Sequence, residues 1–386
     1  MSTTEFYLRK QYIDKNRALQ VFITGDPVLP YMLKMYKQKG LVIKNRFIHS
    51  ILQKISVYPL FKNIVNKMEL NGFYDWEVWN KAPAQLKLTE EEYKKGRKLL
   101  KGIGVKKGVD YVCIHARDNS YTDTLQKRDT YWKDNDFRDC SIENYEAAAL
   151  YLADKGICVI RMGNSNSPPF KTDHPLIIDY ATKYKSDFAD VFLSATCKFF
   201  LGNTSAVYLL SSVFDVPVAY TNMTPIGESG RKKNDIYILK KIYDENTKQY
   251  IPFKGMQRFE DKFFSDQLHA LEQSTYILNR NNSLLYSRLS RDQLEILKTN
   301  RITICENTPD EILWLTKEMN EKIDGVYKKP EDWDKIQKKH LAVFDQNHPF
   351  FLNPPVSPIC FDFVKNNMSL WENDANTIRV DEYNER

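Results

Sequence analysis

From residue 110 onward, short apolar runs alternate with amphipathic stretches, whereas the first hundred residues are dominated by helical patterns. The apolar runs have the length and the branched or aromatic composition of buried strands. Strands and helices that alternate in this way predict a parallel sheet covered on both faces, as in doubly wound nucleotide-binding domains. The expected strands are residues 111–116, 157–162, 176–179, 198–201 and 216–220, and the expected helices are residues 141–155, 187–196 and 204–214.

The first hundred residues predict one clear strand, at residues 18–24, and a helix that opens at Pro30. A further helix begins after Thr89, because Glu92 three residues later completes a capping box. The change of pattern at residues 104–108 marks the expected domain boundary. The N-terminal part is therefore expected to be mostly helical.

The region after residue 220 predicts a short strand at residues 235–239 and a long helical stretch at residues 260–299. Another strand is expected at residues 301–305. The helix that follows it begins after Thr308, which precedes a proline and the glutamate of a second capping box. Residues 325–386 contain tryptophan and phenylalanine and are not low in complexity, so we expect them to pack as helices against the rest of the chain.

The composition is that of a folded protein, since 42% of the 386 residues are hydrophobic and 27% are charged. No apolar run approaches the ~18 residues of a membrane span, and the N-terminal sequence MSTTEFYLRK lacks the apolar stretch of an export signal. The six cysteines form no CxxC pair and have no Cys/His metal-ligand spacing. These features favour a location in the reducing cytoplasm.

The net charge of +6 arises from 56 basic and 50 acidic residues spread along the chain. This excess is too dilute to argue for a nucleic-acid partner. It is compatible with an anionic small-molecule substrate, or with weak attraction of the protein to an anionic membrane surface.

Polar residues follow the first strand of the predicted parallel sheet, where ligands of open α/β sheets bind. They are His115, a potential cation, Arg117 and Asp118. Arg117 suits a diphosphate, because its planar guanidinium can donate two parallel hydrogen bonds to phosphate oxygens. An Arg-Asp pair that merely closes the strand end is an equally good interpretation.

The strand at residues 198–201 runs into Gly202, Asn203, Thr204 and Ser205 before a predicted helix. Free backbone N–H groups and two hydroxyls at a helix start would attract an anion. Thr204 or Ser205, taken alone, is more simply explained as the helix N-cap. There is no P-loop lysine spacing and no GxGxxG, so neither ATPase nor nicotinamide chemistry is indicated.

A third strand end carries Arg161, Gly163 and Asn164, which also fit an ordinary strand-to-loop turn. The motif Asp134-Asn135-Asp136 has the D-x-D form that binds metal and nucleotide in some glycosyltransferases. It lies in a charged stretch without a preceding apolar strand, so we interpret it as a solvated loop.

Three segments in fixed order resemble a family of bacterial glycosyltransferases of surface polysaccharide assembly. They are HARD, SIENYEAAALYLADKGICVIRMGN and IIDYATKYKSDFADVFLSATCKFFLGNTSAVYLLSSVFDVPVAYTN. The likeness continues through DIYILKK, ENTPDEILWLTKEMNEKIDG and the closing EDWDKIQKKH and FDFVKNN segments, and so covers most of the chain after about residue 105. The motifs are moderately specific as an ordered set and weak one by one.

The resemblance implies an α/β fold of GT-B type, in which two Rossmann-type domains face each other across a cleft. It implies a reduced acceptor-side domain at residues 1–105, a domain for the nucleotide sugar at residues 106–300, and a strand-helix unit with a helical tail at residues 301–386. Relatives begin with a strand and a Gly-His turn before a helix similar to TEFYLRK, which stands here at residues 4–10. That first strand and its loop are either missing from this chain or rebuilt.

The family motifs also assign residues to a donor site. They fall on Arg117, Asp118, Arg161, Gly163, Asp179, Tyr180, Ser186, Asp187, Asp190, Gly202, Thr204, Ser205, Asn222 and Lys240. The expected donor-binding set is His115, Arg117, Arg161, Gly163, Asn164, Ser186, Asp187, Asp190, Gly202, Asn203, Thr204, Ser205, Asn222 and Lys240.

The expected reaction is transfer of a sugar from a nucleotide-sugar donor to a hydroxyl of a glycan or lipid-linked glycan, without metal or cofactor. Arg117, Arg161 and residues 202–205 would stabilise the nucleoside diphosphate that leaves. Asp118 or Asp26 would be the general base. The sugar transfer would take place in the cytoplasm, and the protein could also make peripheral contact with the inner face of the membrane. Alternatives are a nucleotide-sugar epimerase, or a truncated module that binds a nucleotide or a partner without turnover.

Overall fold

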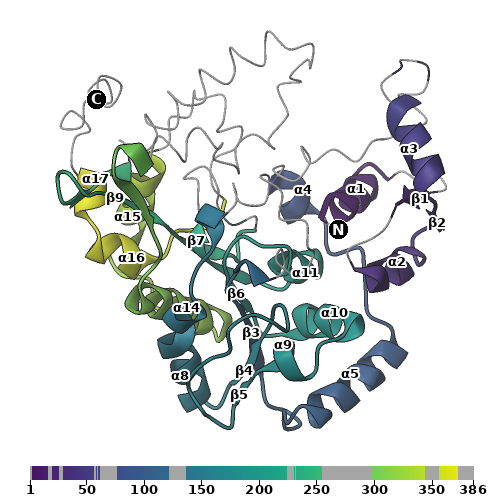
Figure 1. Cartoon of the computed structure of the whole chain (residues 1–386), viewed down its shortest axis with the longest axis horizontal. Helices are drawn as coiled ribbons and strands as arrows, with labels where there is room; N and C mark the ends of the chain where they lie inside the picture. Colours follow the sequence, from purple (N-terminus) through teal and green to yellow (C-terminus); the bar gives the residue numbers. More distant parts are fainter. Residues whose placement is uncertain are drawn as a thin grey trace.

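The computed structural model describes residues 2–15, 20–25, 29–55, 58, 60, 76–120, 136–223, 230, 232–253, 298–343 and 356–372. Within these residues the chain forms a mixed α/β fold around a six-stranded parallel sheet (Figure 1). A three-stranded antiparallel sheet and a two-stranded parallel sheet accompany it. None of the described helices is both long and apolar enough to cross a membrane.

The six-stranded sheet has the order β5-β4-β3-β6-β7-β8, and all its pairs are parallel. The chain steps outward from β3 to one edge and then from β6 to the other, which is the order of doubly wound dinucleotide-binding sheets. The prediction of a parallel sheet is thus confirmed. Its strands are β3 (Tyr111–His115), β4 (Cys158–Arg161), β5 (Ile177–Ile178), β6 (Phe200–Gly202), β7 (Val218–Met223) and β8 (Ile236–Leu239).

Helices cover both faces of this sheet. Figure 1 shows α8 (Glu146–Asp154) and α14 (Pro309–Ile323) on one side, with α10 (Asp187–Thr196) and α11 (Tyr208–Val213) on the other. A short helix, α9 (Tyr180–Lys183), contacts β4. Because the strands are covered on both faces, they are mainly apolar rather than alternating, and β3, β4, β6, β7 and β8 are buried along their whole length.

One predicted helix boundary is wrong. The helix expected over residues 204–214 begins only at Tyr208. Residues before it bend instead, because the Ser205 hydroxyl accepts a hydrogen bond from the Val207 N–H at 3.3 Å and so offers the backbone a local alternative to helix. Neither Thr204 nor Ser205 is therefore the N-cap of α11.

The C-terminal part extends the main core. The small antiparallel sheet joins β9 (Lys241–Asp244) to β10 (Gln249–Tyr250) and β11 (Ile302–Cys305). The described residues of the tail form α15 (Trp333–Leu341), α16 (Phe361–Asn366) and α17 (Ser369–Glu372) and share one apolar cluster with the sheet. All but the last two residues of the helical stretch expected at 260–299 lie outside the described residues.

The N-terminal part contains a strand that was not predicted. The missed strand, β2 (Leu41–Lys44), pairs in parallel with β1 (Val21–Thr24). It is only four residues long and is stabilised by its pairing with β1, a non-local contact that the local pattern does not reveal. Gly40 makes the pairing possible, because a Cβ there would lie 2.4 Å from the Gln20 carbonyl oxygen.

Helices surround this strand pair and connect it to the main sheet. Their order is α1 (Ser2–Ile13), α2 (Pro30–Tyr36) between the two strands, α3 (Arg46–Ile55), α4 (Trp76–Lys81) and α5 (Glu90–Gly102). The predicted capping box of α5 is confirmed, with both of its hydrogen bonds formed. A second apolar cluster joins Phe22 and Met35 to Val191 of α10 and Leu210 of α11, so the N-terminal unit packs on the α10–α11 face.

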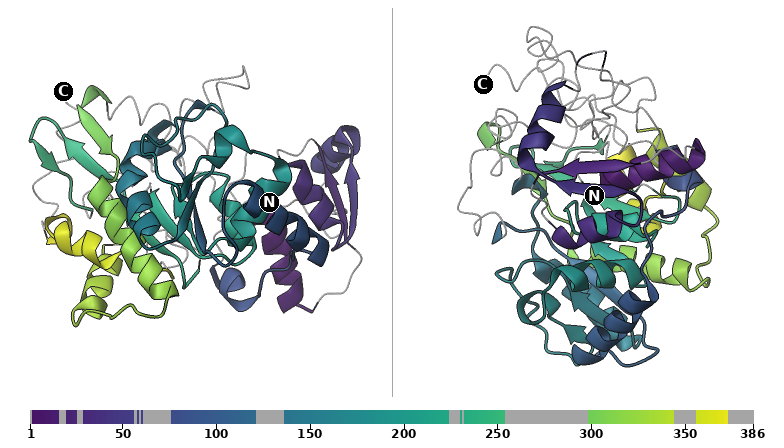
Figure 2. Two further views of the ribbon diagram at one scale, coloured as in Figure 1. Left: turned by 90° about the horizontal axis from the view of Figure 1, so that it is seen from below. Right: turned by 90° about the vertical axis from the view of Figure 1, so that its right-hand side faces the viewer.

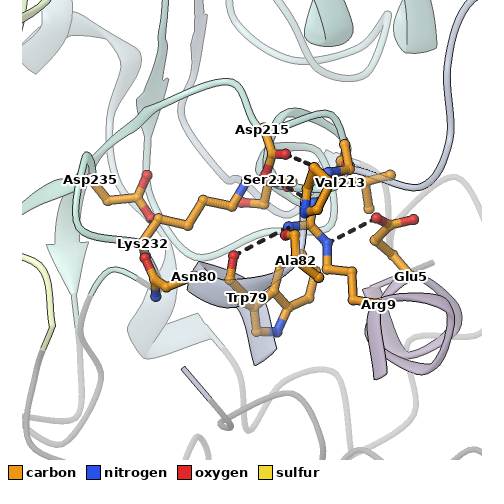
Figure 3. Close-up of polar contacts among 12 residues, drawn as sticks. Glu5, Arg9, Trp79, Asn80, Ala82, Ser212, Val213, Asp215, Lys232 and Asp235 are labelled. Atoms are coloured by element: carbon orange, nitrogen blue, oxygen red, sulfur yellow. Dashed lines mark hydrogen bonds and ion pairs between the residues drawn. The ribbon is translucent and has the colours of Figure 1, made fainter. Parts of the chain in front are cut away.

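A fully buried arginine on α1 ties the N-terminal unit to the turn after α11 (Figure 3). Arg9 donates from Nε to Glu5 at 2.9 Å, and from Nη1 to the carbonyl oxygens of Trp79 and Ala82 at 3.2 and 2.7 Å. Its Nη2 donates to the Val213 carbonyl at 3.3 Å and to the Asp215 carboxylate at 2.9 Å. These five bonds use the full donor capacity of a guanidinium.

Asp215 is the shared acceptor of this cluster (Figure 3). Its Oδ1 also accepts from the Lys232 ammonium at 2.5 Å, and its Oδ2 accepts from the Ala84 N–H at 2.5 Å. Lys232 donates a second bond to the Ser212 carbonyl at 2.6 Å. Burial raises the pKa of Glu5 from 4.5 to about 7 in spite of the attraction of Arg9. The cluster thus connects segments that are far apart in the sequence through buried ion pairs and hydrogen bonds.

Candidate functional site

The carboxyl ends of β3 and β6 lie side by side at the point where the strand order reverses, which is where open α/β sheets bind ligands. His115, the last residue of β3, pairs in register with Gly202, the last of β6. A Cβ at position 202 would lie 2.4 Å from the His115 carbonyl oxygen, so only glycine permits this approach. The two predicted strand ends, 115–118 and 202–205, are therefore adjacent.

Asn203 connects these two loops to a third. Its Oδ1 accepts from the Arg117 backbone N–H at 2.8 Å, and its Nδ2 donates to the Arg138 carbonyl oxygen at 2.6 Å. Arg138 in turn donates from Nη2 to the Thr204 carbonyl at 2.8 Å and from Nε to the Thr204 hydroxyl at 3.3 Å. Arg117 and Arg138 are thereby held together at the edge of the sheet.

The two guanidinium groups repel each other in a partly desolvated environment. Burial, and then the charge of Arg138, lower the pKa of Arg117 to about 10. Asp136 and Asp118 oppose this effect, and Asp139 forms an ion pair with Arg117 Nη1. Asp139 Oδ2 is buried and accepts no hydrogen bond from the rest of the described chain. An arrangement with two adjacent cations is suited to a dianion such as a diphosphate.

Lys240 supports the loop that carries Arg138. Its ammonium donates to the carbonyl oxygens of Phe137 and Asp139 at 2.8 and 2.7 Å. Burial, and the positive charge of Arg117, lower the pKa of Lys240 from its ordinary value. Two of its donors therefore fix the backbone of residues 137–139 beside Arg117, which is a positioning role.

The end of β4 joins the same edge through His115. The ring Nδ1 lies 3.3 Å from the Met162 carbonyl oxygen, which can only accept, so Nδ1 carries the proton. Burial lowers the pKa of His115 from 6.5 to about 4, so the imidazole is neutral near pH 7 rather than the cation suggested by the sequence. Gly163 follows with a φ of 134°, a left-handed conformation that favours glycine, and its carbonyl accepts from Lys185 at 2.7 Å.

Asp118 ends a chain of hydroxyl groups that links β3 to the turn after β4. Asp118 Oδ1 accepts from the Ser120 N–H at 2.9 Å and from the Ser120 hydroxyl. The Ser120 and Ser167 hydroxyls are 2.8 Å apart. Asp118 is half-buried, and its other oxygen has no hydrogen bond to any residue that the structure describes. Asp26, the other expected base, lies outside the described residues.

Other expected donor-binding residues have structural partners away from the Arg117–Arg138 pair. Arg161 is buried and pairs with Asp179 at 2.7 Å. Asn222 and Asn307 exchange hydrogen bonds between backbone N–H and side-chain oxygen at 2.5 and 2.7 Å. Ser186, the N-cap of α10, accepts from the Ala189 N–H at 3.3 Å.

The remaining three expected residues lie in the first turn of α10 and in the turn after β4. Asp190 accepts from the Tyr180 hydroxyl at 3.0 Å and pairs with Lys185 at 3.0 Å. Asp187 is exposed in the first turn of α10, and Asn164 is half-buried in the turn after β4. The structure thus separates a compact group around Arg117 from this outer set.

The sequence did not single out Arg138, Asp139 or Lys185. Arg138 and Asp139 lie in a charged stretch with no strand or helix pattern, and Arg138 reaches the site only through its contacts with residues 203–204. No residue of the described ranges belongs to a cluster of three or more His, Cys, Asp or Glu side chains that could hold a metal ion. Asp134 and Asn135 of the D-x-D motif are outside those ranges, whereas Asp136 begins a short 3₁₀ turn.

Comparison with known proteins gives one distant structural likeness. No protein-family model matches the sequence, and no curated protein is similar to it. The chain is similar to a solved structure described as the glycosyl transferase family 9 from Veillonella parvula DSM 2008, with 13% sequence identity and a TM-score of 0.29. The likeness covers 50% of this chain and 60% of that one, so the chain matches less than two thirds of the length of that protein.

Proposed function

We propose that this chain transfers a sugar from a nucleotide-sugar donor to a hydroxyl group of a glycan or lipid-linked glycan. The observation that carries the proposal is the convergence of Arg117 and Arg138 at the carboxyl ends of β3 and β6. A doubly wound sheet with two adjacent guanidinium groups at its switch point is suited to a nucleoside diphosphate. The resemblance of the ordered motifs to those of bacterial glycosyltransferases supports the same reaction.

In this proposal the diphosphate takes the place of the Asp139 carboxylate beside Arg117. Phosphate oxygens would then accept hydrogen bonds from both guanidinium groups and relieve the repulsion between them. The leaving nucleoside diphosphate gains negative charge as the glycosidic bond to the donor breaks. Cations that are already held in place by Asn203, Thr204 and Lys240 stabilise that charge without a costly rearrangement.

Asp118 is the proposed general base, with Asp26 as the alternative from the opposing domain. An acceptor hydroxyl must lose its proton as it attacks the anomeric carbon, and a carboxylate within hydrogen-bond reach can take that proton. The Ser120 hydroxyl and N–H, which both donate to one oxygen of Asp118, orient the carboxylate. The second oxygen then faces the acceptor.

The proposal includes a GT-B arrangement and no obligatory metal. The β1–α2–β2 unit is a second parallel strand-helix-strand element, and its presence supports an acceptor-side role for residues 1–105. Residues 106–300 would hold the donor, with residues 301–386 packed on them. Because Arg117, Arg138 and Lys240 supply positive charge, turnover should continue in an excess of chelator; strict dependence on added manganese would favour the D-x-D motif instead.

A panel of sugar nucleotides tests the function in two steps. Thermal stabilisation first identifies the nucleotide and sugar that bind. The best donor is then incubated with and without an acceptor glycan, and the products are followed by chromatography and mass spectrometry. Transfer requires that donor consumption depend on the acceptor. An isomerised donor without acceptor would indicate an epimerase, and stabilisation without consumption in either case would indicate a binding module.

A further inference from the structure

Exposed apolar side chains gather on the N-terminal unit, away from the sheet edge described above. Most of the large exposed apolar residues in the described chain belong to residues 12–60. Three of them lie on α3: Phe47 is 73% exposed, Ile51 is 41% exposed and Ile48 is 38% exposed. A cluster of this kind marks an interaction surface more often than a chance exposure.

The sequence of α3 is strongly amphipathic, but only part of its apolar arc is covered. Phe47, Ile48 and Ile51 lie on the same arc as Leu52 and Ile55, given 3.6 residues per turn. Leu52 and Ile55 are half-buried, whereas the first three side chains are exposed. One side of the apolar arc of α3, with Leu52 and Ile55, therefore packs against the protein, and the other side, with Phe47, Ile48 and Ile51, faces solvent.

The packed margin of α3 rests on the strand pair. The helix contacts β1, and both His49 and Arg46 come within 3.9 Å of the position that a Cβ would take at Gly25. Figure 1 shows α3, β1 and β2 at the outer edge of the molecule, and the right-hand view of Figure 2 shows this side facing the reader. Phe47, Ile48 and Ile51 thus belong to the periphery rather than to the junction with the main sheet.

The same region carries charge of only one sign. Residues 29–55 contain no aspartate or glutamate. Their six basic residues, all exposed, are Lys34, Lys37, Lys39, Lys44, Arg46 and Lys54. These six charges equal the net charge of +6 of the whole chain, so the remainder is neutral overall. Apolar residues and cations therefore meet on one element without any acidic neighbour in sequence.

We propose that α3 docks the protein on an anionic lipid surface, with Phe47, Ile48 and Ile51 inserted among the acyl chains. Arg46 and Lys54, at the two ends of α3, and Lys44, the last residue of β2 just before it, would meet the lipid phosphates. A symmetric contact with a second copy of this chain would bring twelve cations together, which disfavours it. Charge complementarity thus selects a bilayer that contains anionic lipid.

Vesicle sedimentation tests this surface directly. The full chain is mixed with vesicles of phosphatidylcholine alone, or of phosphatidylcholine with phosphatidylglycerol. We expect binding only when phosphatidylglycerol is present, and loss of binding as salt increases. Phe47→Glu should lower the partition coefficient by about tenfold or more, because a buried phenyl group is replaced by a hydrated anion. The matched control is Val326→Glu, which changes a residue that is 62% exposed in the C-terminal half and should bind as the wild type does.

A fluorescence measurement keeps the proposal testable if Phe47→Glu folds poorly. The Phe47→Trp variant should show a blue shift of its emission, relative to the wild type, on addition of phosphatidylglycerol vesicles, whereas Val326→Trp should not. Binding that is equal for both kinds of vesicle, or that survives Phe47→Glu, would overturn the proposal. So would a dimer of the wild type that Phe47→Glu dissociates, because the surface would then be a protein interface.

Discussion

The protein contains two clusters in which arginine meets aspartate, and their construction differs. Arg9 is fully buried, and its five hydrogen bonds end on acceptors from three separate parts of the chain. Arg117 retains 13% exposure of its side chain and lies beside a second arginine whose charge lowers its pKa. The first cluster is saturated by the fold itself, whereas the second brings two guanidinium groups together, and burial and their mutual repulsion lower the pKa of Arg117.

This difference distinguishes charges that stabilise the fold from charges that are available to bind a ligand. A buried cation that is fully satisfied can gain nothing from a ligand, and its removal leaves carboxylates stranded. Two cations that repel each other gain from an added anion, and the loss of one costs the fold less. The predictions below separate these roles, beginning with the largest expected effect.

Arg9→Ala should be the most destabilising single change of the set. It leaves Glu5 and Asp215 without their common partner in a desolvated interior, so we expect a loss of about 3–5 kcal/mol in the free energy of unfolding. Urea denaturation followed by circular dichroism measures it. Arg97→Ala, which removes an exposed arginine of α5, is the matched control and should change stability little. Equal stability of the two variants would show that the contacts of Arg9 do not stabilise the fold.

Arg117→Ala should act on the ligand more than on the fold. Loss of a charged hydrogen bond to the diphosphate, at about 1.5–3 kcal/mol, predicts at least a tenfold loss of turnover or of donor affinity. Arg138→Ala should act in the same direction. Isothermal titration with the best nucleotide, compared with Arg97→Ala, measures the effect. Unchanged binding in both variants would remove the pair from the donor site.

The titration of Glu5 should make stability fall as pH rises. Its pKa is raised to about 7 in the folded protein, from 4.5, so the native state holds a proton that the unfolded chain has released. That contribution is present below about pH 4.5 and is lost as the pH rises through 7. Between these two pH values, the free energy of unfolding should fall by about 1 kcal/mol per pH unit. Glu5→Gln keeps a side-chain oxygen that can accept a hydrogen bond from Arg9 but cannot titrate. When the free energy of unfolding is measured against pH for both proteins, this part of the pH dependence should be present in the wild type and absent in the variant.

Asp139→Asn should have the smallest effect, and of opposite sign. If Asp139 occupies the place of the diphosphate beside Arg117, its neutralisation should strengthen nucleotide binding by a few-fold, since an anion then meets no competing carboxylate. The Lys240 contacts should persist, because they involve backbone carbonyl oxygens of residues 137 and 139. Weaker binding in this variant would instead identify Asp139 as a residue that positions Arg117.

Local sequence patterns predicted the parts of the fold that depend on local chemistry. The two capping boxes are formed as expected at Thr89 and Thr308, and α10 has the predicted bounds. Each predicted strand of the parallel sheet is present, because strands buried on both faces are recognisable as short runs of mainly apolar residues. The parallel pairing of β3 with β6, which the structure reveals, then brings residues 117 and 203 together.

Features that depend on non-local partners could not be predicted. The strand β2 requires β1, and Arg138 joins the candidate site only through residues 203 and 204. Arg9 lies on a helix with a polar, weakly patterned sequence, and its aspartate partner is 206 positions away. No local window contains such information, because the contact exists only after the chain has folded.

That separation in sequence has a consequence for biosynthesis. Arg9 leaves the ribosome well before Asp215 does, because the two residues are 206 positions apart in the sequence. Throughout that interval the helix that carries Arg9 must keep its charge hydrated, outside its final environment. The helix that carries Arg9 can therefore reach its final contacts only after the segment that contains Asp215 has been made.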